Sequence, residues 1–235
     1  MGVYWAEMAD ENQTEQQVQF LKSYLKSSGY ILDLACGSGR HSIALRKDGY
    51  AMVGLDVSRK LLKIAKQRSA DLPLVLGDIR FLPFRTGTFA AAISIDTSFG
   101  YLPSEADDKT SLAETRRVLS TKGLFVIDVF NEEHLVLKYK SQNISIKEKD
   151  YPIFFLQQKR KVSDSGDWLC DSWVIRDKSS GQVRFFEHKV RLYGRDKLRF
   201  LLEGAGFRVN RVLGGYDGEE LAVDSAQLIF LAVPG

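Results

Sequence analysis

The sequence predicts a doubly wound α/β domain interrupted by an antiparallel sheet. Over roughly the first 130 residues, nearly continuous apolar runs alternate with amphipathic helical segments, which is typical of parallel strands covered on both faces. Between positions 141 and 193 the runs become long and strand-like, joined by Ser- and Gly-containing turns that indicate hairpins. After Gly194 the α/β pattern returns, so the hairpins interrupt the α/β part rather than follow it.

Length and composition support one large core. The chain has 235 residues, of which 44% are hydrophobic and 27% charged, and these values exclude a disordered chain, a collagen and a disulfide mini-protein. The net charge of +3 lacks the concentrated basic field of a nucleic-acid-binding protein. We therefore expect no nucleic-acid partner.

The two cysteines and the apolar runs indicate the compartment. Cys36 and Cys170 form no Cys-x-x-Cys pair and no metal-ligand spacing, so we expect free thiols, no metal and a reducing, cytoplasmic location. Glu7 and Asp10 precede any apolar run, which argues against a signal peptide. No run reaches eighteen apolar residues, so no membrane partner is expected.

Helix caps and apolar spacing place the elements of the α/β part. Thr14 and Gln17 have capping-box spacing and predict the start of the first helix, which Gly29 ends. Ser58 is expected to cap a helix after the second strand, and Leu112 and Leu119 mark a later helix. We expect seven strands, at residues 30–35, 51–56, 74–76, 90–95, 124–130, 207–213 and 227–233.

The insertion is predicted to contain strands at 153–162, 168–176 and 183–193. We expect residues 1–140 and 194–235 to form the α/β domain, and 141–193 to form a lid over the carboxyl ends of its strands. A dimerisation surface is the alternative, so the chain is expected to be a monomer or a homodimer.

Three strands of the α/β part are associated with acidic residues at their ends. Asp33 precedes a turn containing Gly37 and Gly39, and glycine lets a backbone pass close to a ligand. Asp56 ends the second strand, seventeen residues after Gly39, where a carboxylate can accept both hydroxyls of a ribose. Asp78 follows the third strand. In open α/β sheets ligands bind beyond the carboxyl ends of the strands, so we expect a ligand there.

In this order, the stretches DLACGSGRHS, GLDVS, GDIRFLPF and ISIDTSFGY resemble the motifs of class I S-adenosylmethionine-dependent methyltransferases. TEQQVQFL, GLFVIDVFN, VRLYGRDKLRFLLEGAGF and AQLIFLAVPG resemble the subgroup with an antiparallel sheet inserted after strand five. The resemblance covers nearly the whole chain and implies a Rossmann-like, mostly parallel seven-stranded sheet. Ala35 departs from the pattern, because the motif most often has its first glycine there.

The resemblance implies S-adenosylmethionine as cofactor and S-adenosylhomocysteine as product. It places Asp56 on the ribose, Asp78 on the adenine amine and Asp96 beside the sulfonium. The full set implied for the cofactor is Asp33, Ala35, Cys36, Gly37, Gly39, Arg40, Asp56, Val57, Asp78, Ile79 and Asp96. The set expected to contact the substrate is Ser98, Phe99, Tyr101, Asn131, Tyr193, Tyr4 and Trp5.

A dedicated base is optional, because the cofactor carries the difficult chemistry and proximity supplies much of the rate. Tyr193, His188 and Tyr101 are the catalytic candidates. Tyr4 and Trp5 precede the first helix, where they either pack on the core or form a flap over the site.

Four functions compete. The first is methyl transfer to a small-molecule acceptor under the inserted sheet. The second is methyl transfer to RNA or protein, for which helical basic residues such as Lys22 and Arg46 would provide a surface. The third is a non-catalytic S-adenosylmethionine-binding protein. A nicotinamide-dependent dehydrogenase is the most remote, because Ser42 replaces the third glycine of its fingerprint.

Overall fold

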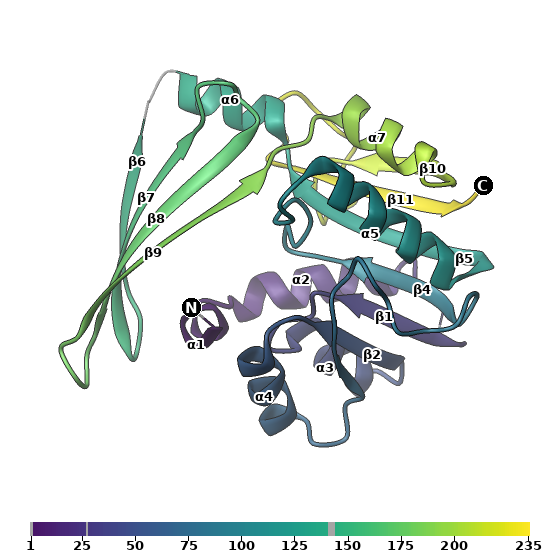
Figure 1. Cartoon of the computed structure of the whole chain (residues 1–235), viewed down its shortest axis with the longest axis horizontal. Helices are drawn as coiled ribbons and strands as arrows, with labels where there is room; N and C mark the ends of the chain where they lie inside the picture. Colours follow the sequence, from purple (N-terminus) through teal and green to yellow (C-terminus); the bar gives the residue numbers. More distant parts are fainter. Residues whose placement is uncertain (1, 27, 141–143) are drawn as a thin grey trace.

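The computed structural model describes residues 2–26, 28–140 and 144–235, and within these it contains two separate sheets (Figure 1). The larger sheet has seven strands in the order β10-β11-β5-β4-β1-β2-β3. Its strands are β1 (Tyr30–Leu34), β2 (Ala51–Asp56), β3 (Leu74–Leu76), β4 (Phe89–Ser94), β5 (Leu119–Phe130), β10 (Phe207–Leu213) and β11 (Gln227–Pro234). The predicted α/β class and the seven strands are confirmed.

The strand order sets the position of the site. β1 to β5 pair in parallel, whereas β11 is antiparallel to both β5 and β10. The chain runs outward from β1 through β2 to β3 and then returns to β4 on the other side of β1. A crevice opens at such a reversal, at the carboxyl ends of β1 and β4.

Helices cover both faces of this sheet (Figure 1). One apolar core joins α2 and α3 to residues such as Ile31, and the other joins α5 and α7 to residues such as Leu32. Because neighbouring strand residues face opposite sides, Ile31 and Leu32 are both fully buried. The helices are α1 (Gly2–Glu7), α2 (Glu11–Lys22), α3 (Arg40–Lys47), α4 (Arg59–Arg68), α5 (Glu105–Val118), α6 (Glu132–Lys140) and α7 (Arg195–Gly204).

The second sheet is antiparallel and lies between α6 and α7 in the sequence, as predicted. Its order is β6 (Ser145–Asp150), β7 (Phe154–Val162), β8 (Trp168–Asp177) and β9 (Val183–Arg191). The predicted start of the insertion, at 141, lies outside the described residues. Strand β6 was not expected from the sequence, because its last four residues, Lys147 to Asp150, are all charged and the edge strand is exposed. Phe155 and Phe185 lie exposed on this sheet, whereas Leu169 is buried.

The start of the chain differs from the prediction. α2 begins at Glu11, and its N-cap is Asp10, whose carboxylate accepts a hydrogen bond from Gln13 N at 3.1 Å. Thr14 therefore lies inside the helix, and its hydroxyl bonds to the Asp10 carbonyl at 2.7 Å. The preceding segment, which was not expected to be helical, forms the short helix α1. Ser58 does cap α4, accepting from Leu61 N at 3.3 Å.

Helix α1 connects the two sheets. It packs against α4 on one side, and Tyr4 contacts the inserted sheet on the other. The Tyr4 and Phe154 rings are 4.9 Å apart, and both join a buried cluster with Trp173. Figure 1 shows α1 at the foot of the inserted sheet, next to α4.

The end of the inserted sheet is fixed to α5 by a buried carboxylate. Asp108 of α5 has no exposed surface, and it accepts hydrogen bonds from Arg191 and from the Tyr193 hydroxyl, the latter at 2.7 Å. Arg191 N also donates to the Gly100 carbonyl at 2.9 Å. A Cβ on Gly100 would lie 2.6 Å from the Arg191 carbonyl oxygen, so this approach requires glycine.

Along the described ranges, no helix has the length and apolar character needed to cross a membrane.

We predict that Tyr193→Phe destabilises the protein by about 1–3 kcal/mol, because the buried Asp108 carboxylate loses a donor. Urea unfolding of the full chain measures the effect. Tyr30→Phe is the matched control, since Tyr30 is 56% exposed and its hydroxyl can bond to water. Equal effects of the two substitutions would show that the Asp108 contact contributes nothing.

Candidate cofactor and acceptor site

A cavity of about 440 Å³ lies at the carboxyl ends of β1, β2 and β4. Its volume is within the range of small-ligand sites. The walls come from the turn after β1, the start of α4, the loop after β4, and the α1–α2 segment. A second hollow, of about 480 Å³ and lined by Arg46, Lys47 and Asp71, lies at the start of β2, away from the strand ends where such folds bind ligands.

The turn after β1 is tied to the end of β2. Ala35 and Gly37 both adopt φ of 56°, in the left-handed region, and Gly37 N donates to Asp56 Oδ2 at 2.8 Å. The other oxygen of Asp56 accepts from Ser58 N at 2.7 Å. One carboxylate thus holds two turns and still lines the cavity. Because Ala35 replaces the expected glycine, its positive φ is strained.

Asp33 is a second buried acid in this wall. Asp33 lines the cavity and accepts a hydrogen bond from Ser42 Oγ at 2.6 Å. Burial raises the pKa of Asp33 to about 7, against the opposing effects of Ser42 and Arg40. Burial also raises the pKa of Asp56. These carboxylates pay a desolvation cost that a cationic ligand would reduce.

The loop after β4 has a strained backbone and is held by Asp128 and Arg40. Asp96 and Thr97 adopt φ of 64° and 55°, which is rare for residues other than glycine. Asp128 on β5 accepts a hydrogen bond from Thr97 N at 3.1 Å. Arg40 pairs with Asp96 at 2.8 Å and also donates to Gln17 at 2.7 Å. Arg40 therefore joins the loop after β4 to helix α2.

The structure brings most of the predicted site residues to this cavity. Those implied for the cofactor that line it are Asp33, Ala35, Cys36, Gly37, Arg40, Asp56, Val57 and Asp96, and those expected for the substrate are Ser98, Tyr101 and Trp5. The predicted residues that do not line it are Gly39, Asp78, Ile79, Phe99, Asn131, Tyr193, Tyr4 and His188.

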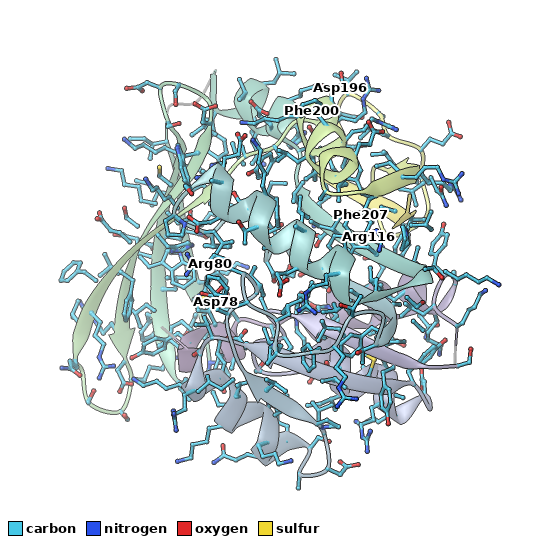
Figure 2. The ribbon with its side chains drawn as sticks, turned by 45° about the vertical axis from the view of Figure 1, so that its right-hand side comes forward. Asp78, Arg80, Arg116, Asp196, Phe200 and Phe207 are labelled. Carbon is cyan, nitrogen blue, oxygen red and sulfur yellow. The ribbon has the colours of Figure 1, made fainter. Side chains whose placement is uncertain are left out.

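Asp78 is engaged by its neighbour. Arg80 donates from Nη2 and Nε to Asp78 Oδ2, at 2.7 and 3.1 Å, and continues to Asp107 at 2.8 Å. Figure 2 shows the Asp78 and Arg80 side chains next to each other, below α5. The hydrogen bonds from Arg80 lower the pKa of Asp78 against the effect of burial. Asp78 can make its predicted bond to the adenine amine only through an oxygen lone pair that Arg80 does not use.

The α1–α2 segment forms more of the cavity wall than the flap of Tyr4 and Trp5 that the sequence suggested as one alternative. Trp5, Ala6, Met8, Ala9, Asp10 and Gln13 all line the cavity, yet only Trp5 was expected there. The available signal was the pair of adjacent aromatic residues, Tyr4 and Trp5. A six-residue helix has too few turns to show helical periodicity.

The catalytic candidates occupy different environments. Tyr101 lines the cavity and is 44% exposed. Tyr193 is fully buried, and its hydroxyl donates to Asp108. Asn131, expected as a substrate contact, donates instead to the Ser225 carbonyl at 2.8 Å. His188 lies on the inserted sheet beside Tyr101, with ring centroids 6.1 Å apart.

This strand order, with an acid-lined cavity at the reversal between β1 and β4, is that of the class I S-adenosylmethionine-dependent methyltransferases. Residues 31–123 match the model of a family described as methyltransferase domain, which confirms the resemblance found in the sequence. This part of the chain is thus similar to a methyltransferase domain, whose cofactor is S-adenosylmethionine and whose product from the cofactor is S-adenosylhomocysteine.

One curated relative and several solved structures match the chain over most of its length. It is 27% identical to the putative methyltransferase YqeM of Bacillus subtilis, over 93% of this chain and 89% of that protein. The CcbJ methyltransferase of Streptomyces caelestis has a similar fold, with a TM-score of 0.84 and 14% identity, over 100% of this chain and 96% of that one. CalS10 of Micromonospora echinaspora, an amino pentose methyltransferase solved with S-adenosylmethionine bound, has a TM-score of 0.69 and 16% identity, over 99% and 95% of the two chains.

We predict that Asp128→Asn changes how stability depends on pH. Burial raises the pKa of Asp128 to about 7, so the folded chain keeps a proton that the unfolded chain releases near pH 3.8. The folded state thus binds more protons in this window, and the free energy of unfolding falls as pH rises through it. The variant should show a shallower fall in urea unfolding. Parallel curves for both proteins would contradict this.

Proposed function

We propose that the chain transfers a methyl group from S-adenosylmethionine to a small-molecule acceptor. The observation that carries the proposal is the roof of the cavity: α1 lies over the strand ends and is itself backed by the inserted sheet. A site covered in this way suits a compact acceptor better than a polymer. CalS10, which shares the fold, acts on an amino pentose, and this similarity supports the same class of acceptor.

The residues of the cavity fit the cofactor. S-adenosylmethionine has a ribose diol and positive charge at its amine and sulfonium, and the wall offers the acids Asp33, Asp56 and Asp96. We assign Asp56 to the ribose diol, because its carboxylate lines the cavity at the end of β2. The turn from Ala35 to Gly37 gives backbone close to the ligand, and Trp5 and Tyr101 exclude water.

When bound, the cofactor supplies an activated methyl group, so the protein needs to align the acceptor and keep the site dry. The protein meets these needs with rigid parts. Thr97 is held by Asp128, and Asp96 by Arg40, so the loop after β4 is fixed where the acceptor would bind.

Transfer to RNA is the second candidate, and the surface charges favour it less. Lys22 pairs with Asp48 at 2.6 Å and Arg46 with Asp71 at 2.8 Å. Such exposed pairs neutralise part of the basic helical surface that RNA phosphates would need. A non-catalytic role would require a bound cofactor without any acceptor that takes the methyl group.

Incubation with methyl-labelled S-adenosylmethionine tests the proposal. Cell metabolite fractions, purified RNA and purified protein are offered separately to the full chain. We expect the label in a small-molecule fraction. Label that enters RNA or protein instead, or cofactor binding without transfer to any fraction, would contradict the proposal.

We predict that Asp56→Ala weakens binding of S-adenosylhomocysteine at least tenfold. Each hydrogen bond to a charged acceptor contributes about 1.5–3 kcal/mol, and the ribose diol would lose its carboxylate. Calorimetry measures the affinity, and thermal unfolding reports how far loss of the Gly37 and Ser58 contacts loosens the turns. Asp71→Ala, at the remote hollow, is the control. Unchanged affinity in Asp56→Ala would remove this residue from the cofactor site.

A further inference from the structure

The inserted sheet carries one row of charged side chains across three strands. Arg160 of β7 pairs in register with Asp171 of β8, and Asp171 pairs with His188 of β9. Asp171 is 4% exposed, and its neighbours on the same face of β8, Leu169 and Trp173, are also buried. Side chains two apart on a strand share a face. The row therefore lies on the covered face of the sheet.

Asp171 orients the two side chains beside it. Arg160 donates to both of its oxygens, at 2.8 and 2.6 Å, and His188 Nε2 lies 3.4 Å from Oδ2. Burial acts to raise the pKa of Asp171, but the hydrogen bonds from Arg160 and His188 outweigh it and lower the pKa to about 2. The ionised carboxylate can only accept, so neutral His188 carries its proton on Nε2 and leaves Nδ1 as a bare acceptor.

Two buried nitrogen atoms of this cluster have no hydrogen-bond partner. They are His188 Nδ1 and Trp173 Nε1, and the two rings lie 4.7 Å apart. Buried polar atoms normally find partners, and an unpartnered one costs about 1–3 kcal/mol. His188 Nδ1 can accept a hydrogen bond and Trp173 Nε1 can donate one. A single ligand group with an O–H or N–H proton and a lone pair could therefore satisfy both atoms.

The cluster adjoins the cavity. Trp5 and Tyr101 both line the cavity and both contact the His188 ring, with centroids 5.5 and 6.1 Å apart. His188 therefore lies directly behind two walls of the site, on the side of the inserted sheet. His188 does not itself line the cavity, so transfer of a proton to it requires the Tyr101 side chain, which is 44% exposed, to turn aside.

We propose that His188 Nδ1 receives the proton of the methyl acceptor and that Asp171 is its positioning residue. This inference rests on the proposed function and narrows the acceptor to a molecule that reacts through an O–H or N–H group. The acceptor's lone pair forms the bond to the methyl carbon while the carbon–sulfur bond breaks toward sulfur. The proton left on the acceptor's oxygen or nitrogen goes to His188 Nδ1.

The tautomer of His188 tests the positioning part without any acceptor. The full chain, with its histidines labelled by nitrogen-15 and loaded with S-adenosylhomocysteine, is studied by NMR at a pH where the imidazole is neutral. The chain has three histidines, and His188→Gln identifies the resonances of interest. We expect Nε2 protonated and Nδ1 bare, and a mixture of tautomers in Asp171→Asn. A mixture in the wild type, or an unchanged tautomer in Asp171→Asn, would overturn the inference.

Turnover tests the catalytic part, with the metabolite fraction that takes label from the wild type as the probe. A glutamine places its amide near Nε2 but offers nothing at Nδ1, so His188→Gln should lower labelling about a hundredfold, with S-adenosylhomocysteine affinity unchanged. Glu187→Gln, at the neighbouring position on β9, is the matched control. Wild-type labelling by His188→Gln would refute the role of His188. Failure of the proposed function is distinct, because then the wild type labels no small-molecule fraction.

Discussion

The position of the inserted sheet depends on the buried carboxylate of Asp108. Burial raises the pKa of this group, and the hydrogen bond from Tyr193 and the charge of Arg191 oppose that rise. The cost of burying Asp108 is thus offset only when the end of β9 lies against α5. The same strand end holds the Gly100 carbonyl, which fixes the loop that carries Tyr101 into the cavity. The inserted sheet and the site are therefore aligned by this polar contact together with the apolar clusters that join α1 and α6 to the sheet.

The cavity itself follows from strand order and from shared hydrogen bonds. Parallel strands bring Asp33 and Asp56 to one edge, and Asp56 then serves the turns on both sides. The strained Asp96–Thr97 loop persists because Asp128 and Arg40 hold it. Strain and buried charge thus concentrate at the ligand-binding edge, while the rest of the sheet is ordinary apolar packing. Such concentration is typical of functional sites.

Local patterns predicted what depends on local physics. The seven strands, the antiparallel insertion and the Ser58 cap are each encoded within short windows of sequence. Thr14 was wrong as a cap because Asp10, four residues earlier, competes better for the same role. Helix α1 depends on a partner distant in the sequence, as Tyr4 on Phe154 shows. Strand β6 depends on pairing with the adjacent β7, which its run of charged residues does not signal. The engagement of Asp78 by Arg80 depends on a side-chain rotamer, which no motif specifies.

The contacts of α1 also bear on how the molecule is assembled. This helix leaves the ribosome well before its apolar partners Phe154 and Trp173 are made. A helix of six residues is not stable in water by itself. The segment therefore stays unfolded during synthesis until its partners have emerged. The wall that it builds over the cavity forms only after the inserted sheet has emerged. A chain stalled before β8 would therefore have the strand-end acids of the site but not its roof.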